Sequence, residues 1–135
     1  MGEYEDRADI IAITHDYCWA LDRKEWHELD DVFLADATAV LGQRECANLE
    51  EIKEMCSTSL GRFDDSQHIA ATHQVRIDGD TATCRCYLHA QHIRHSDDGE
   101  THYIVGGRYE DDFVRTPDGW RITHRTLTVM WSTKP

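Results

Sequence analysis

The sequence has few basic residues. Its 135 residues include 14 Lys and Arg against 26 Asp and Glu, a formal net charge of −12, and the basic residues do not cluster anywhere along the chain. Proteins that bind nucleic acids or anionic membranes need a basic face that neutralises phosphate groups. The composition therefore predicts that neither a nucleic acid nor a membrane surface is a partner of this chain.

Long hydrophobic runs are also missing. No apolar stretch approaches the roughly 20 residues of a membrane-spanning helix. The acidic start, MGEYEDRADII, lacks the basic and apolar regions of a secretory signal. The length suits one domain with one hydrophobic core. We therefore expect a single domain over residues 1–135 and a cytoplasmic location.

Paired cysteines and metal-ligand spacings are absent as well. The five cysteines are an odd number without a CxxC motif, which argues against a disulfide framework and a zinc knuckle. The nine histidines form no set with cysteines or carboxylates at a spacing typical of zinc sites. We therefore expect no metal, and we expect the cysteines to be small buried side chains.

Helical periodicity is confined to the first half of the chain. Apolar residues at three- and four-residue spacing predict helices over residues 4–22, around 26–33 and over 49–60. Asn48 and Glu51 have the spacing of a capping box at the start of the third helix. Three helices are therefore expected before the strands that dominate the second half.

Strand patterns fill the rest of the sequence. Residues 37–41 predict a short strand, and two long strands between Ser66 and His95 are joined by the turn Asp78-Gly79-Asp80. Two further strands follow over 102–115 and 120–131. Helices segregated from an antiparallel meander define an α+β fold. We expect a cone-shaped α+β barrel, with three N-terminal helices packed on a strongly curved, mainly antiparallel sheet that encloses a pocket.

One strand carries the pattern of a pocket wall. Every second residue from Ala82 to Ala90 is small or apolar, and the same face ends in His92. Small side chains beside a histidine indicate a cavity rather than a solid core. The side chains expected to shape this cavity are Trp19, Met55, Tyr103, Tyr109, Met130 and Trp131.

Four motifs carry a resemblance to a known family. They are Tyr17-x-x-x-Leu21-Asp22-x-x-x-Trp26, His68 ten residues before Asp78-Gly79-Asp80-x-Ala82, Gly106-Gly107-Arg108-Tyr109-x-Asp111-x-Phe113, and Asp118-Gly119-Trp120-Arg121-Ile122. Together they span nearly the whole chain. The sequence resembles the SnoaL-like family, which belongs to the superfamily with the nuclear transport factor 2 fold.

The resemblance implies cofactor-free chemistry. By motif, the similar enzymes are scytalone dehydratase, bile-acid 7α-dehydratase and dehydrochlorinase, which use an Asp–His pair in the cone. Their aspartate and histidine correspond to Asp22 and His68, with Tyr17 and His92 at the positions of further site residues. The sequence departs from two of these enzymes at Leu21, where scytalone dehydratase has tyrosine, and near Val129, where the bile-acid enzyme has arginine.

The residue types suit proton transfer. A neutral imidazole removes a proton next to a carbonyl, and a carboxylate on its other nitrogen fixes the tautomer. His68 would be the general base and Asp22 its partner, while Tyr17 and His92 would assist. The expected function is a lyase or isomerase reaction on a hydrophobic small molecule. A polyketide-cyclase-like aldol closure and a non-catalytic ligand-binding or assembly module remain alternatives.

The orientation of His68 depends on the first long strand. Strict alternation places His73 on the face of Val75 and Ile77, and His68 on the opposite face. A β-bulge near Ala70-Ala71 would return His68 to the inner face. His73 is therefore the alternative base.

The outer face of the sheet is expected to be an interface. Arg85, Tyr87, Arg108 and Arg125 alternate outward in the predicted strands. The resemblance implies that such a face packs against another subunit. We therefore expect a homodimer or a homotrimer.

Overall fold

A computed structural model describes residues 2–133. These residues form two α-helices, one 3-10 helix and six strands. Two strands separate the 3-10 helix from the second α-helix, and four long strands come last. The elements are α1 (Glu3–Arg23), η1 (Trp26–Asp31), β1 (Phe33–Leu41), β2 (Arg44–Cys46), α2 (Leu49–Leu60), β3 (Asp65–Asp78), β4 (Thr81–Ser96), β5 (Gly99–Thr116) and β6 (Gly119–Ser132).

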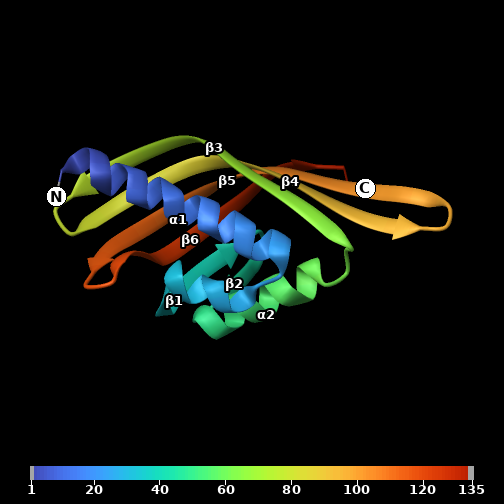
Figure 1. Ribbon diagram of the computed structural model, residues 1–135, viewed down its shortest axis with the longest axis horizontal. Coiled ribbons are helices and arrows are strands. Elements are labelled where there is room, and N and C mark those ends of the chain that lie inside the picture. Colours follow the sequence, from blue (N-terminus) through green and yellow to red (C-terminus); the bar gives the residue numbers. More distant parts are fainter. Residues whose placement is uncertain (1, 134–135) are drawn as a thin grey trace.

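The six strands form one mixed sheet in the order β2-β1-β6-β5-β4-β3. All neighbouring strands are antiparallel except β1 and β6, which are parallel. Figure 1 shows α1 crossing one face of the curved sheet, α2 beside β1 and β2, and the β4–β5 hairpin projecting beyond the rest. The predicted α+β class and the predicted meander of four antiparallel strands are confirmed.

The segment around residues 26–33 differs from the prediction. It forms the short 3-10 helix η1, which ends at Asp31, and β1 then begins at Phe33 instead of residue 37. Phe33 pairs with Ile122 of β6, and the register of the two strands shifts before Thr38. Sheet pairing on β6 therefore overrides the helical spacing of the apolar residues here.

The third predicted helix is confirmed with its cap. The Asn48 side chain accepts a hydrogen bond from the Glu51 backbone N–H at 2.9 Å. The Glu51 carboxylate accepts from the backbone N–H of Ala47 at 3.0 Å, one residue earlier than in a standard capping box. The cap fixes the start of α2, whose inner face closes one side of the cone.

A β-bulge interrupts β3. The pairing of β3 with β4 shifts register between Ala71 and Gln74, and Thr72 has a φ of +61°, a conformation unusual for a β-branched residue. The bulge places His68 and His73 on the same face of the sheet, toward the helices. The predicted bulge is confirmed, slightly later in the sequence than Ala70-Ala71.

The core contains a buried ion pair. Arg125 Nε and Nη2 donate to the two carboxylate oxygens of Asp111 at 2.7 and 2.8 Å, and both side chains are fully buried. The guanidinium carbon lies 4.3 Å from the centre of the Tyr17 ring and 3.8 Å from that of the Tyr109 ring. The ion pair therefore joins β5 and β6 to α1 through two cation–π contacts.

The position of Arg125 corrects the prediction that it lies on the outer face. The β5–β6 register shifts between Asp112 and Phe113, so that Asp112 pairs with His124 and Phe113 with Ile122. Thr123 is therefore the extra residue of a bulge, and Ile122 and Arg125 both point inward. The other three predicted outer residues, Arg85, Tyr87 and Arg108, are exposed.

A second ion pair ties the start of α1 to the sheet. The Asp6 carboxylate is 4% exposed and accepts from two nitrogens of Arg115 at 2.7 and 2.9 Å and from the Trp120 indole at 3.1 Å. The hydrogen bonds from Arg115 and Trp120 lower the pKa of Asp6 to about 2. The contact fixes the angle at which α1 crosses the sheet.

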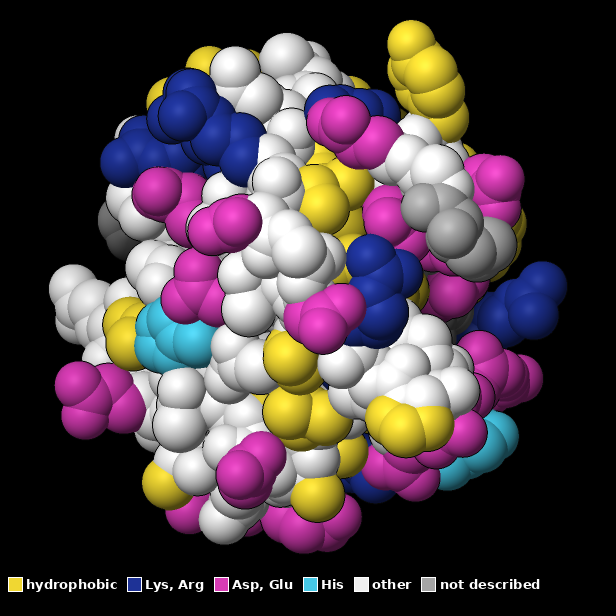
Figure 2. All heavy atoms as spheres, turned by 90° about the vertical axis from the view of Figure 1, so that its left-hand side faces the viewer, with side chains coloured by type: hydrophobic (Ala, Val, Ile, Leu, Met, Phe, Trp, Pro, Cys, Tyr) yellow, Lys and Arg dark blue, Asp and Glu magenta, His cyan; other side chains and the backbone are white. Residues whose placement is uncertain are grey.

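The described surface is predominantly acidic. Figure 2 views the molecule from the end that carries the β3–β4 and β5–β6 turns and shows carboxylate side chains spread over that face among fewer Lys and Arg. Across residues 2–133, no helix combines the length and the apolar character that crossing a bilayer requires.

Replacing Arg125 with Met tests the buried ion pair. Arg125→Met leaves the Asp111 carboxylate buried without its partner, which destabilises a protein by about 3–5 kcal/mol. Urea unfolding should show this loss. The matched change Arg108→Met, on the exposed face, should alter stability by less than about 0.5 kcal/mol. Adding Asp111→Leu to Arg125→Met should recover much of the loss, and an unchanged unfolding midpoint in Arg125→Met would contradict the ion pair.

Replacing Asp6 with Asn tests the second ion pair through its pH dependence. The pKa of Asp6 in the folded state is about 2, below the ordinary value of 3.8. Its contribution to stability is therefore present above about pH 4 and is lost as the pH falls toward 2. The difference in melting temperature between wild type and Asp6→Asn should shrink over that range. Asp9→Asn, at an exposed position of α1, is the control, and a difference that does not change with pH would contradict the assignment.

Candidate active site

A cavity of about 220 Å³ lies between the inner face of the sheet and the two α-helices. Its volume is below the roughly 300–1,000 Å³ of sites for drug-sized ligands, which favours a small molecule. Most of its wall is apolar, and the polar side chains are few. The polar and ionisable lining residues are Tyr17, Cys56, Ser59, Arg62, His68, His92, Tyr103 and Tyr109.

Asp22 and His68 form a hydrogen-bonded pair beside the cavity. His68 Nδ1 lies 2.6 Å from Asp22 Oδ1, which also accepts from Ser66 Oγ at 2.8 Å. Asp22 Oδ2 accepts from the backbone N–H of His68 at 2.9 Å. Three bonds from one stretch of β3 therefore fix the carboxylate. Because a carboxylate only accepts, neutral His68 carries its proton on Nδ1 and leaves the Nε2 lone pair free.

Tyr17 and Asp22 both lie on helix α1, which does not end between them. It continues to Arg23, with Lys24 in the left-handed conformation as its C-cap. The two residues are about 140° apart around an ideal helix. Tyr17 faces the cavity, whereas Asp22 faces β3 and is absent from the cavity wall. The His68 side chain lines the cavity and its Nδ1 contacts Asp22. Asp22 can therefore influence a molecule in the cavity only through His68.

His92 is the second imidazole of the cavity. Its ring centre is 5.7 Å from that of His68, at an interplanar angle of 86°. His92 Nδ1 lies 2.9 Å from the backbone oxygen of Tyr103, which makes Nδ1 the donor. Burial is the main cause that lowers the pKa of His92 below 6.5, and its hydrogen bond to Tyr103 acts against it. His92 is therefore a neutral imidazole at physiological pH.

Tyr17 is a neutral phenol in the cavity wall. It is 2% exposed, and burial raises its pKa well above the usual value of 10. Its hydroxyl lies 3.7 Å from Cys56 Sγ. Its ring packs edge-on against Phe33 and Tyr109 at 5.8 Å. Tyr17 can therefore donate a proton or a hydrogen bond, but does not act as a base.

Three of the six predicted cavity-shaping residues lie in the wall: Met55, Tyr103 and Tyr109. The other three predictions, Trp19, Met130 and Trp131, are wrong, since these side chains are 60%, 51% and 49% exposed and do not line the cavity. Trp19 lies about 200° around the helix from Tyr17, on its opposite face.

A further register shift explains Met130 and Trp131. Gly106 pairs with Trp131 and Gly107 with Val129, so Met130 is the extra residue of a bulge. The shift turns Trp131 to the outer face, where its indole lies directly over the backbone of Gly106. Val129 stays on the inner face and lines the cavity.

His73 points inward at a different place. Its Nε2 lies 2.8 Å from Thr14 Oγ1 and its ring is 5.2 Å from that of His15, both on α1. His73 does not line the cavity. The bulge thus settles the sequence ambiguity: both histidines face the helices, but only His68 reaches the cavity and the aspartate.

The sequence reasoning missed Arg62, Phe63 and Ser59 in the wall. All three belong to the end of α2 and the segment after it, where Gly61 stops the helix. Nothing in their spacing indicates a site. Only the position of Arg62, directly after a predicted helix that packs on the sheet, could have drawn attention to it.

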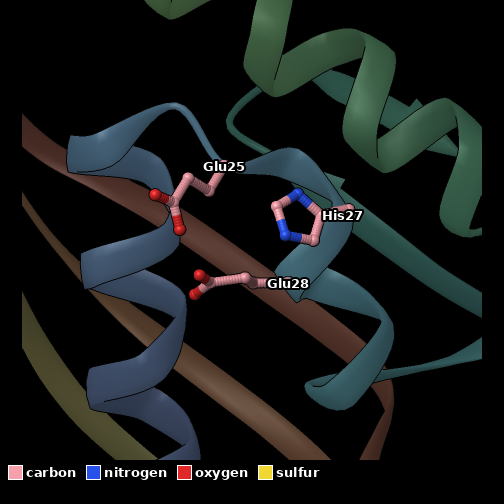
Figure 3. A group of neighbouring side chains, drawn as sticks. All are labelled: Glu25, His27 and Glu28. Carbon is pink, nitrogen blue, oxygen red and sulfur yellow. The ribbon is translucent and has the colours of Figure 1, made fainter.

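Glu25, His27 and Glu28 form a group outside the cavity with potential metal ligands. Their ligand atoms lie within 4.8 Å of one another. Figure 3 shows the three side chains gathered where the chain passes from α1 into η1. A hydrogen bond with the Glu25 carboxyl is the main cause that raises the pKa of Glu28. Solvent-facing acidic side chains commonly gather in this way without an ion.

Residues 2–126 match the family model described as a SnoaL-like domain. The chain belongs to this family. A relative from Mycobacterium tuberculosis (strain ATCC 25618 / H37Rv), itself uncharacterised, is 36% identical over 132 residues, which cover 95% of this chain and 88% of that protein.

Solved structures share the fold of this chain. A protein from Kribbella flavida has a TM-score of 0.90 at 28% identity and covers 98% of this chain and 96% of its own. A candidate scytalone dehydratase from Novosphingobium aromaticivorans has a TM-score of 0.86 at 20% identity, covering 98% and 89%. A nuclear transport factor 2 superfamily protein from Salmonella enterica has a TM-score of 0.84 at 17% identity, covering 98% and 96%. The fold is therefore the cone of that superfamily.

The two histidine tautomers give a direct test of the site geometry. His68 and His92 each place Nδ1 on an acceptor, the Asp22 carboxylate and the Tyr103 carbonyl. Both neutral rings should therefore carry the proton on Nδ1 and present Nε2 as an acceptor. Long-range proton–nitrogen NMR correlations at pH 8 distinguish the tautomers. An Nε2-protonated His68 would contradict the Asp22 contact, and Asp22→Ala should remove the preference at His68 but not at His92.

Proposed function

We propose that this SnoaL-like protein is a cofactor-independent lyase or isomerase that removes a proton next to a carbonyl group of a small hydrophobic substrate. The observation that carries the proposal is the 2.6 Å contact between His68 Nδ1 and Asp22 at the edge of a largely apolar cavity. An aspartate that accepts a hydrogen bond from Nδ1 of an imidazole leaves the Nε2 lone pair available as a base.

His68 is the general base of this proposal. Its side chain is 5% exposed, so its Nε2 lone pair meets a bound molecule with little competition from water. When the ring takes up a proton, the Asp22 carboxylate stabilises the imidazolium. A positioned base of this kind contributes roughly 10²–10⁴-fold in rate.

Tyr17 and His92 supply the remaining polar groups. A carbonyl oxygen that gains negative charge needs a hydrogen-bond donor. The hydroxyl of Tyr17, a neutral phenol in the cavity wall, would be this donor. In an elimination, the departing hydroxyl also needs a proton, which Tyr17 can donate. His92 presents Nε2 as an acceptor and orients a substrate hydroxyl.

The same groups serve two alternatives. An aldol closure of the polyketide-cyclase type also begins with removal of a proton next to a carbonyl. A non-catalytic binding module needs the apolar wall but not the Asp22–His68 pair. The name of the Novosphingobium aromaticivorans protein favours a dehydratase, but at 20% identity that likeness extends to the fold alone. The pair therefore favours the enzyme over the binding module.

Exchange of a substrate proton for deuterium tests the proposal without knowledge of the final product. Aryl β-hydroxy ketones and β-hydroxy acids would be incubated in D₂O, with NMR following the proton next to the carbonyl. Wild type should accelerate exchange, and His68→Gln should lower the rate roughly 10²–10⁴-fold. Asp22→Asn should lower it as well, because the amide stabilises the imidazolium less.

His89→Gln is the matched control for this experiment. His89 lies on the same strand as His92 but on the exposed outer face, so its replacement should leave the exchange rate unchanged. Equal rates for His68→Gln and wild type would remove His68 from the mechanism. Binding of these molecules without exchange in wild type would favour the binding module.

The outer face of the sheet supports a further part of the proposal, assembly with a second copy of the chain. Ile69, Tyr87 and Trp131 are each about half exposed on this face. Large apolar side chains gathered on one face of a sheet are typical of protein interfaces. Sedimentation of wild type and of Tyr87→Glu would report whether a homodimer or homotrimer uses this face.

A further inference from the structure

One arginine lines the cavity without a carboxylate partner. Arg62 follows the end of α2, and within residues 2–133 its guanidinium donates only to the backbone oxygen of Ser59, at 3.4 Å. Its neighbours in the wall are Ser59 and Phe63. In a chain with 26 acidic and 14 basic residues, an arginine at the edge of an apolar cavity that pairs with no acid is available to a bound molecule.

The backbone around Arg62 is held in place by other cations. Arg94 Nε and Nη2 donate to the Arg62 carbonyl at 3.1 and 2.8 Å, and Lys24 Nζ donates to the Phe63 carbonyl at 2.7 Å. The Asp64 N–H donates to the Ile93 carbonyl at 2.9 Å. Strand β4 and the end of α1 therefore fix this short segment, in which Arg62 and Phe63 line the cavity.

The segment lies next to the histidines. The Phe63 ring is 5.0 Å from the His92 ring and 6.2 Å from the Tyr103 ring. The Arg62 guanidinium lies 5.9 Å from the centre of the Phe63 ring and the Arg94 guanidinium 5.4 Å from it. A molecule that contacts His68 and His92 therefore reaches Arg62 across the face of Phe63.

We infer that Arg62 is a specificity-determining residue that binds a carboxylate on the substrate. The substrate class would then be a small aromatic or aliphatic carboxylic acid, with its apolar part in the cone and its anionic end at Arg62. A planar guanidinium matches a carboxylate with two parallel hydrogen bonds. The inference rests on the proposed function for the position of the reacting carbon near His68, but the binding step can be measured separately.

A pair of probes isolates the charge. 1-Naphthaleneacetate and 1-naphthaleneacetamide have nearly the same shape, and only the first is an anion. Calorimetric titration of wild type should give an affinity at least roughly tenfold higher for the acid than for the amide, because the two hydrogen bonds to the carboxylate are charge-assisted. In Arg62→Gln this preference should vanish, while the affinity for the amide changes by less than about twofold. Arg62→Lys should keep part of the preference.

Arg76→Gln is the matched control. Arg76 lies exposed on the outer face of β3 and has no ion pair within the described residues, so its replacement makes the same change in net charge far from the cavity. The preference for the acid should survive in this variant. Equal affinities of wild type for the two probes, an unchanged preference in Arg62→Gln, or failure of both probes to bind would overturn the inference.

The experiment separates this inference from the proposed function. Binding of the probes needs no proton transfer, so His68→Gln should retain the preference for the acid even though it loses proton exchange. If wild type prefers the acid through Arg62 but exchanges no substrate proton, carboxylate binding is supported and the lyase or isomerase proposal is contradicted. If wild type exchanges the proton through His68 but does not prefer the acid, the proposed function is supported and carboxylate binding is contradicted.

Discussion

The buried pair of Arg125 and Asp111 is the interaction on which the interior depends. A guanidinium removed from water is costly unless other groups compensate its charge. Asp111 accepts hydrogen bonds from Nε and Nη2, the rings of Tyr17 and Tyr109 cover the guanidinium, and Nη1 has no hydrogen-bond partner among the described residues. Both tyrosines also line the cavity. The need to compensate one charge therefore fixes the distance between α1 and the sheet and shapes the end of the cavity.

The β-bulges of the sheet decide which side chains point toward the interior. Each one inserts a residue and turns the side chains beyond it to the other face. The bulge in β3 brings His68 to the inner face together with His73, and the bulge at Thr123 brings Arg125 inward. The strained φ of Thr72 marks the first of these positions. One bulge thus orients a side chain of the candidate site, and another orients the arginine of the buried ion pair.

Sequence reasoning succeeded where the period was regular: it predicted α2 with its cap, the four-stranded meander and the inner face of β4. The candidate pair of Asp22 and His68 came from the family resemblance and against strict alternation, and the two side chains lie in contact at 2.6 Å. It failed for Arg125 and Trp131 because a single inserted residue reverses alternation without leaving a signal in composition. It failed for Arg62 because this residue lies in a turn after a helix. A turn has no regular repeat from which the direction of a side chain could be predicted.

Helix α1 joins the stabilising and the functional contacts in one element. Asp6 anchors its first turn to Arg115 and Trp120, Tyr17 packs over Arg125, and Asp22 holds His68 near its last turn. Because a helix is stiff, a contact at either end restricts the position of the other. The carboxylate behind His68 is therefore positioned by the packing of the whole helix, which explains how a residue outside the cavity can orient the imidazole inside it.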